Sequence, residues 1–100
     1  MPPRTPIVLI VEDDPVNQSL LTEVCRGEGY LVATADDGEA ALVAIASRVV
    51  DLVLLDAALP KIDGFEVCRR IRQTTDVPVI IVSASPEEQA RGPALEAGAV

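Results

Sequence analysis

The sequence predicts an α/β fold in which a parallel β-sheet carries helices on both faces. Three observations lead to this fold class. Short apolar runs rich in β-branched residues lack the polar and apolar alternation of a half-exposed sheet, so these strands are expected to be buried on both sides. Stretches with helix start signals separate the runs. The two kinds of segment alternate as β-α-β-α-β-α-β-α, and right-handed crossovers then place each helix against the sheet.

Four segments are expected as strands. Three of them are apolar throughout most of their length: residues 7–11 (IVLIV), 51–55 (DLVLL) and 77–82 (VPVIIV). A weaker candidate covers residues 30–34.

Four helices are expected, because each has a side chain that can cap its first turn. An N-cap oxygen accepts a hydrogen bond from amides that have no partner inside the helix. The start signals are Asp14 before Pro15, Asp36 with Glu39, Asp63 with Glu66, and Ser85 before Pro86 with Glu88. Gly27 and Gly29 are expected to end the first helix, and Gly98 the fourth.

The composition is that of one compact domain. The chain has 100 residues, of which 49% are hydrophobic, and this suffices for one core of ordinary size. No apolar run approaches the roughly 20 residues that cross a bilayer, and residues 1–6 hold no apolar signal-peptide core. A cytoplasmic protein without membrane contact is therefore expected. The net charge of -8 argues against electrostatic binding of nucleic acid by this region.

The two cysteines, Cys25 and Cys68, fall in expected helices, and the chain has no histidine. Neither a disulfide framework nor a mixed Cys/His zinc site is indicated. Both cysteines are expected to be reduced packing residues.

Acidic residues follow two of the expected strands at the point where each strand ends. Glu12, Asp13 and Asp14 come directly after the first strand, and Asp56 comes after the third. Ligands of open α/β sheets bind beyond the carboxyl ends of the strands. If the strand order is 2-1-3-4, the first and third strands are neighbours and these carboxylates share one pocket. Crowded carboxylates need a proton or a cation, and Mg²⁺ prefers oxygen ligands of this kind. The alternative interpretation, as solvated loop acids and helix caps, stays open for Asp13 and Asp56 and is favoured for Asp14.

Three separated motifs resemble the receiver domains of bacterial two-component signalling. The opening IVLIVEDDPVNQ is similar to the start of such domains, DLVLLDAALPKIDGFEVCRRIR to their phosphoacceptor segment, and VPVIIVSA to their fourth strand with its hydroxyl residue. The resemblance implies a flavodoxin-like, doubly wound parallel sheet with strand order 2-1-3-4. It also implies a receiver domain over residues 7–100, preceded by a disordered lead over residues 1–6.

The resemblance implies a role for particular residues. Asp56 would be the phosphorylated carboxylate, Asp13 would bind Mg²⁺ directly, and Glu12 would bind it through water. The backbone carbonyl of Ala58 would be a further metal ligand, and Ser83 would hydrogen-bond the phosphoryl group. The donor would be a phosphohistidine on a histidine kinase or on a histidine phosphotransfer domain. Carboxylates are ordinarily ionised at neutral pH, so such a nucleophile needs no general base. The domain would catalyse only its own phosphorylation and dephosphorylation.

The family has a fifth strand, an invariant lysine, a switch aromatic and a final helix after the segment that ends here at Val100. The resemblance therefore implies a receiver that is truncated at its C-terminus and lacks these elements, with weaker phosphorylation and switching. Lys61 cannot replace the lysine, because it lies on the acceptor loop. Residues 77–82 would then form an unpaired apolar sheet edge that favours pairing with another chain, through aggregation or dimerisation.

Three other functions are compared with a phosphoaccepting receiver. A degenerate receiver that acts as an interaction module without phosphorylation is favoured by the missing lysine and opposed by the complete acidic set. A magnesium-dependent phosphatase would have a second Asp two residues after the nucleophile, where this chain has Ala58. A nucleotide hydrolase would require a G-x-x-x-x-G-K-[ST] loop, which the sequence lacks.

Overall fold

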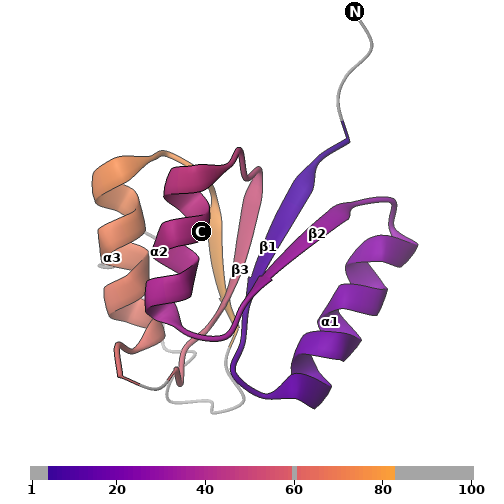
Figure 1. The fold of residues 1–100 in the computed structure, drawn as a ribbon, viewed down its shortest axis with the longest axis horizontal. Helices are drawn as coiled ribbons and strands as arrows, with labels where there is room; N and C mark the ends of the chain where they lie inside the picture. Colours follow the sequence, from indigo (N-terminus) through magenta and orange to yellow (C-terminus); the bar gives the residue numbers. More distant parts are fainter. Residues whose placement is uncertain (1–4, 60, 83–100) are drawn as a thin grey trace, which may run out of the picture.

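The computed structural model describes residues 5–59 and 61–82 and shows a parallel four-stranded sheet with helices on both faces (Figure 1). The elements are β1 (Ile7–Val11), α1 (Pro15–Gly27), β2 (Leu31–Ala35), α2 (Gly38–Ser47), β3 (Leu52–Asp56), α3 (Gly64–Thr74) and β4 (Val79–Val82). The strands lie in the order β2-β1-β3-β4, and each neighbouring pair is parallel. Helix α1 covers one face, and α2 and α3 cover the other (Figure 1). The predicted fold class and strand order are confirmed.

The strand bounds agree with the prediction to within two residues. β1 begins and ends where expected, whereas β2 and β3 each begin and end one residue later. Asp51, the predicted first residue of β3, lies just before the strand. Its Oδ2 accepts a hydrogen bond from the Ile7 amide at 2.8 Å. β4 begins two residues later than predicted, because Pro78 has no amide hydrogen for the sheet; its carbonyl still accepts from Val53 at 3.0 Å.

Two of the predicted helix starts are confirmed. Asp14 is the N-cap of α1 and accepts from the Val16 amide at 3.1 Å, and Asp63 is the N-cap of α3 and accepts from the Glu66 amide at 2.9 Å. Helix α1 ends at Gly27, and Gly29 follows with a φ of 92°, a conformation that glycine adopts readily. The expected fourth helix with Gly98, and residues 1–4 of the expected lead, lie outside the described residues.

The start of α2 corrects the prediction that Asp36 is its N-cap. Asp37 is the cap, since its backbone is extended and its Oδ1 accepts from the Ala40 amide at 2.8 Å. Asp36 instead accepts a hydrogen bond from Nε2 of Gln18 at 3.0 Å. The spacing to Glu39 favours Asp36 as the cap, but in the structure the Asp36 carboxylate bonds Gln18 and the next residue, Asp37, caps the helix.

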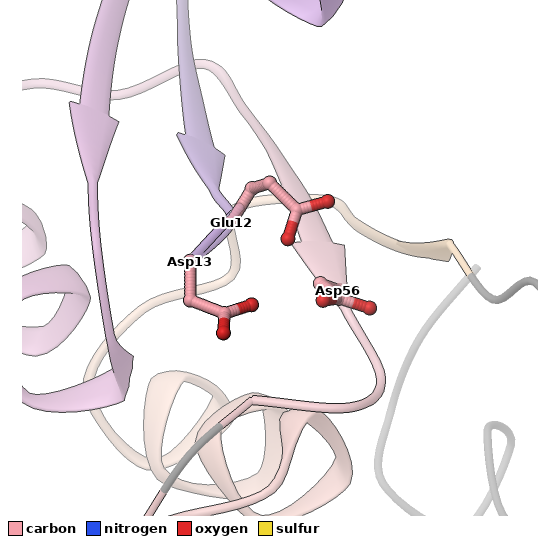
Figure 2. A group of neighbouring side chains, drawn as sticks. All are labelled: Glu12, Asp13 and Asp56. Carbon is pink, nitrogen blue, oxygen red and sulfur yellow. The ribbon is translucent and has the colours of Figure 1, made fainter. Parts of the chain in front are cut away.

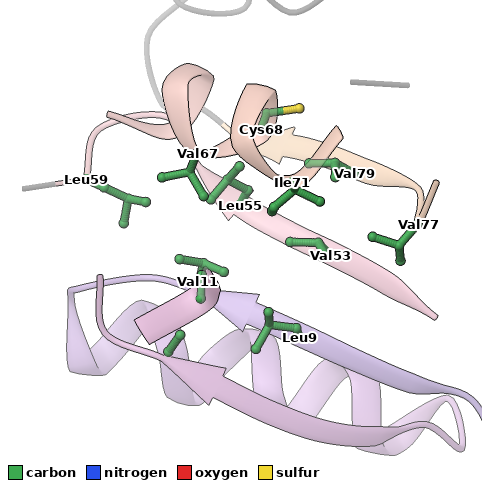
Figure 3. Packing of buried hydrophobic residues seen from close by; sticks show 12 residues of the cluster. Leu9, Val11, Val53, Leu55, Leu59, Val67, Cys68, Ile71, Val77 and Val79 are labelled. Carbon is green, nitrogen blue, oxygen red and sulfur yellow. The ribbon is translucent and has the colours of Figure 1, made fainter. Parts of the chain in front are cut away.

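The main hydrophobic core lies between the sheet and the helices α2 and α3. Figure 3 shows Val67 and Ile71 of α3 packed against Val53 and Leu55 of β3, and all four side chains are fully buried. This packing holds α3 in place next to the carboxyl end of β3.

A smaller core lies under α1 on the opposite face. It consists of Val8, Ile10 and Cys25, with Leu21 packed against it. Both cysteines are buried and free, as expected. Among the helices of the described ranges, none combines the length and the apolar character that crossing a membrane requires.

Candidate metal centre

Three acidic side chains meet at the carboxyl end of the sheet (Figure 2). β1 and β3 are neighbours, with Val11 opposite Leu55, so the residues after these two positions reach the same sheet edge. One carboxylate oxygen from each of Glu12, Asp13 and Asp56 lies within 4.8 Å of the other two. The structure therefore brings together the three carboxylates that sequence reasoning selected.

Glu12 is the buried member of this group. Its side chain is 7% exposed, and its Oε2 accepts a hydrogen bond from the Asp14 amide at 3.3 Å. Burial is the main cause that raises the pKa of Glu12 from its ordinary value of 4.5 to about 7; the neighbouring Asp56 and Asp13 also raise it, and the Asp14 amide lowers it. A proton or a cation is therefore favoured next to Glu12 at neutral pH.

Asp56 is the last residue of β3, and the two residues that follow it are held by hydrogen bonds. Its Oδ1 accepts from the Ala58 amide at 3.1 Å, which leaves Oδ2 as the second carboxylate oxygen. The next residue, Ala57, donates its amide to Val82 of β4 and accepts from Gly64 of α3, both at 3.0 Å. These contacts fix the main chain that carries Asp56.

The remaining predicted residues have different positions. Asp14 caps α1, as its helix-start position suggested. Ala58 lies in the exposed loop after β3, and the role of its carbonyl oxygen stays a prediction. Ser83 lies outside the described residues.

Sequence reasoning missed Gln18, whose side chain reaches the acidic group from α1. Its Nε2 donates to the main-chain oxygen of Glu12 and to Oδ1 of Asp36, each at 3.0 Å. A polar residue in the first turns of a helix is an ordinary surface feature, so the sequence carried no signal for this contact.

The donor set fits a hard divalent cation. All three side chains offer carboxylate oxygens, and in the described part of the chain none of them forms an ion pair with a lysine or an arginine. A small cation with octahedral oxygen coordination, such as Mg²⁺, suits two or three carboxylates that leave positions for water and phosphate oxygens.

Comparison with known sequences agrees with this geometry. The family described as the response regulator receiver domain matches residues 8–100. The chain is 42% identical over 94 residues to the transcriptional regulatory protein AfsQ1 of Streptomyces coelicolor, covering 94% of this chain and 42% of that protein. It is 41% identical over 92 residues to the DNA-binding response regulator MtrA of Mycolicibacterium smegmatis, covering 92% of this chain and 40% of that protein. The chain thus spans about two fifths of these relatives.

Comparison with solved structures gives the same fold. A two-component response regulator from Clostridium difficile superposes with a TM-score of 0.90 at 28% identity, covering 96% of this chain and 79% of that one. The response regulator TrrA from Thermotoga maritima, solved in complex with Mg²⁺-BeF, has a TM-score of 0.87 at 34% identity and covers 95% of this chain and 84% of that one.

Proposed function

Because this chain belongs to the response regulator receiver domain family, we propose that it is a phosphoacceptor in which Asp56 receives a phosphoryl group from a phosphohistidine. The phosphohistidine would belong to a histidine kinase or to a histidine phosphotransfer domain in the cytoplasm. One observation carries this proposal: oxygens of Glu12, Asp13 and Asp56 converge within 4.8 Å at the sheet edge.

The arrangement around Asp56 suits an in-line displacement at phosphorus. The Ala58 amide holds Oδ1, so Oδ2 is the oxygen that forms the new bond to phosphorus. The bond between phosphorus and the donor nitrogen breaks, and the electron pair stays on the imidazole. Catalysis of this transfer depends on position and on charge, and the fixed main chain of Asp56 supplies the position.

Glu12 and Asp13 would hold Mg²⁺ together with Asp56 and the carbonyl of Ala58. When bound, the ion would neutralise the negative charge that the transferring oxygens bring next to three carboxylates. Ser83 would donate a hydrogen bond to the phosphoryl group. The chain would thus promote its own phosphorylation and dephosphorylation and act on no other substrate.

The test is the intact mass of the chain after incubation with acetyl phosphate and Mg²⁺. Wild type is expected to gain the mass of one phosphoryl group, and Asp56→Asn is expected to gain none. Asp63→Asn is the matched control: it removes a carboxylate from the same region, keeps an N-cap residue, and should be phosphorylated like wild type. Transfer from a phosphorylated histidine phosphotransfer domain then tests the donor. A folded wild type without any mass gain would contradict the proposal and favour an interaction module.

A further inference from the structure

Gln18 joins two loops at the acidic site through a single nitrogen. It lies in the second turn of α1, half-buried, and its Nε2 donates to the main-chain oxygen of Glu12 and to Oδ1 of Asp36. The first contact holds the segment after β1, and the second holds the segment after β2.

The contact from Gln18 completes the fixation of Glu12. The Glu12 amide donates to the carbonyl of Ala35 at the end of β2 at 3.1 Å, and the Glu12 carboxylate accepts from the Asp14 amide. The Gln18 nitrogen then takes the remaining polar group, the Glu12 carbonyl. The amide, the carbonyl oxygen and Oε2 of Glu12 thus each have a partner, and the peptide plane between Glu12 and Asp13 cannot turn without losing the contact with Gln18.

We propose that Gln18 is a positioning residue of the metal centre: its amide sets the peptide between Glu12 and Asp13, and thereby directs both carboxylates toward Asp56. The proposal rests on the proposed function, because it concerns the site that would hold Mg²⁺. Ligands that are fixed before the ion arrives bind it more tightly than ligands that must be ordered on binding, and partners of metal ligands change affinity for this reason.

A purely structural role for Gln18 makes a different prediction. If the amide only joins α1 to the loop after β2, its loss would lower the stability of the fold and leave the affinity of the folded protein for Mg²⁺ unchanged. The two roles are therefore separated by measuring affinity and stability on the same variants.

The experiment compares Gln18→Met with wild type in the whole chain. Methionine keeps the length and helix preference of the side chain and removes both donor contacts. Binding of Mg²⁺ alone is followed through the amide resonances of Asp13 and Asp14, and the dissociation constant is expected to rise roughly 10-fold. In the protein without metal, hydrogen exchange at the Glu12 and Asp14 amides is expected to accelerate. Gln18→Ala, which cannot crowd the loop, serves for the same comparison if the methionine variant does not fold.

Two control variants separate the effect of the Gln18 contacts on Mg²⁺ affinity from the effects of stability and of charge. Leu21→Ala removes a side chain that packs under the same helix, so it lowers stability without touching Glu12, and its affinity for Mg²⁺ should equal that of wild type. Asp36→Asn removes a negative charge and keeps an oxygen that accepts from Gln18, so it measures the effect of charge alone.

The outcomes are distinct. A loss of affinity in Gln18→Met that exceeds the losses in both controls supports the positioning role. Equal affinity in wild type and Gln18→Met overturns that role and leaves the proposed function intact, as does an equal loss in Gln18→Met and Leu21→Ala. Absence of Mg²⁺ binding by wild type itself overturns both the positioning role and the metal centre.

Discussion

Among single residues, Glu12 is the acidic side chain of the candidate metal centre that is buried. A carboxylate with 7% exposure beside two other acids is unfavourable when charged, and nothing about folding alone requires an acid at this position. Burial, with a smaller contribution from Asp56 and Asp13, raises the pKa of Glu12 to about 7, so the protein without metal keeps a proton on this side chain near neutral pH. The native state thus holds its proton up to about pH 7, whereas the unfolded chain releases it near 4.5.

This difference predicts a pH-dependent effect of Glu12→Gln in the absence of metal. Between pH 4.5 and 7 the native state binds more protons than the unfolded state, so the free energy of unfolding of wild type falls as pH rises. Glutamine does not titrate, so the variant should match wild type near pH 4.5 and exceed its stability by about 3 kcal/mol at pH 8. Urea unfolding at the two pH values measures this difference.

The exposed Glu23 of α1 supplies the control, because Glu23→Gln makes the same substitution in a side chain that is not buried. An equal gain for Glu12→Gln at both pH values would contradict burial as the cause of the raised pKa.

At the scale of elements, the approach of α3 to the end of β3 decides where Asp56 sits. The Gly64 amide donates to Ala57, and no side chain fits between the helix and the strand at this point. A Cβ on Gly64 would overlap the carbonyl oxygen of Asp56 and lie 2.8 Å from the Cα of Ala57. The start of α3 and Asp56 can therefore not be moved independently.

Gly64→Ala should consequently affect both the fold and the site. Displacing α3 from β3 is expected to cost roughly 1 to 3 kcal/mol of unfolding free energy and to slow phosphorylation by acetyl phosphate. Gly27→Ala is the matched control at the end of α1, where a Cβ meets no atom within 4 Å. That change should be neutral or stabilise the protein by up to about 1 kcal/mol. Normal phosphorylation of a folded Gly64→Ala variant would show that the contact does not position Asp56.

At the scale of the whole molecule, the chain carries a net charge of -8 and gathers three of its acids at one end of the sheet. A cation that binds this end stabilises the native state by mass action, since the unfolded chain has no such cluster. A second chain that binds the folded state would stabilise it in the same way. β4 offers a surface for such binding, because it lies at the edge of the described sheet with Ile80 and Val82 exposed. Dimerisation through this edge stays a prediction.

Addition of Mg²⁺ is expected to raise the urea midpoint of wild type. At a free concentration 100 times the dissociation constant, the gain is about 2.7 kcal/mol. At one fixed concentration of Mg²⁺ the gain should be larger at pH 8 than at pH 6, because Mg²⁺ competes with the proton that Glu12 holds below its pKa of about 7 and its dissociation constant is therefore higher at pH 6. Chelation should reverse the gain, and Asp13→Asn should reduce it. A gain that is independent of pH would indicate that Mg²⁺ binds elsewhere.

The pattern of residues along the chain was enough to predict the strands and helices of the described ranges, and it placed Glu12, Asp13 and Asp56 after the ends of two strands. Strands such as β1 and caps such as Asp14 and Asp63 depend on neighbours along the chain, so they can be predicted from the sequence without knowledge of the fold. The position of Asp56 beside Glu12 depended in addition on the strand order, which the resemblance to receiver domains implied and which places β1 next to β3.

The contacts that join separate loops could not be predicted from the sequence. The donation from Gln18 to Asp36, and the choice of Asp37 as the cap of α2, depend on how α1 and β2 pack at the sheet edge. The burial that raises the pKa of Glu12 depends on the same packing. Hydrogen bonds and desolvation act over a few ångströms of space, and residues that are far apart in sequence come within that distance only when the sheet has formed.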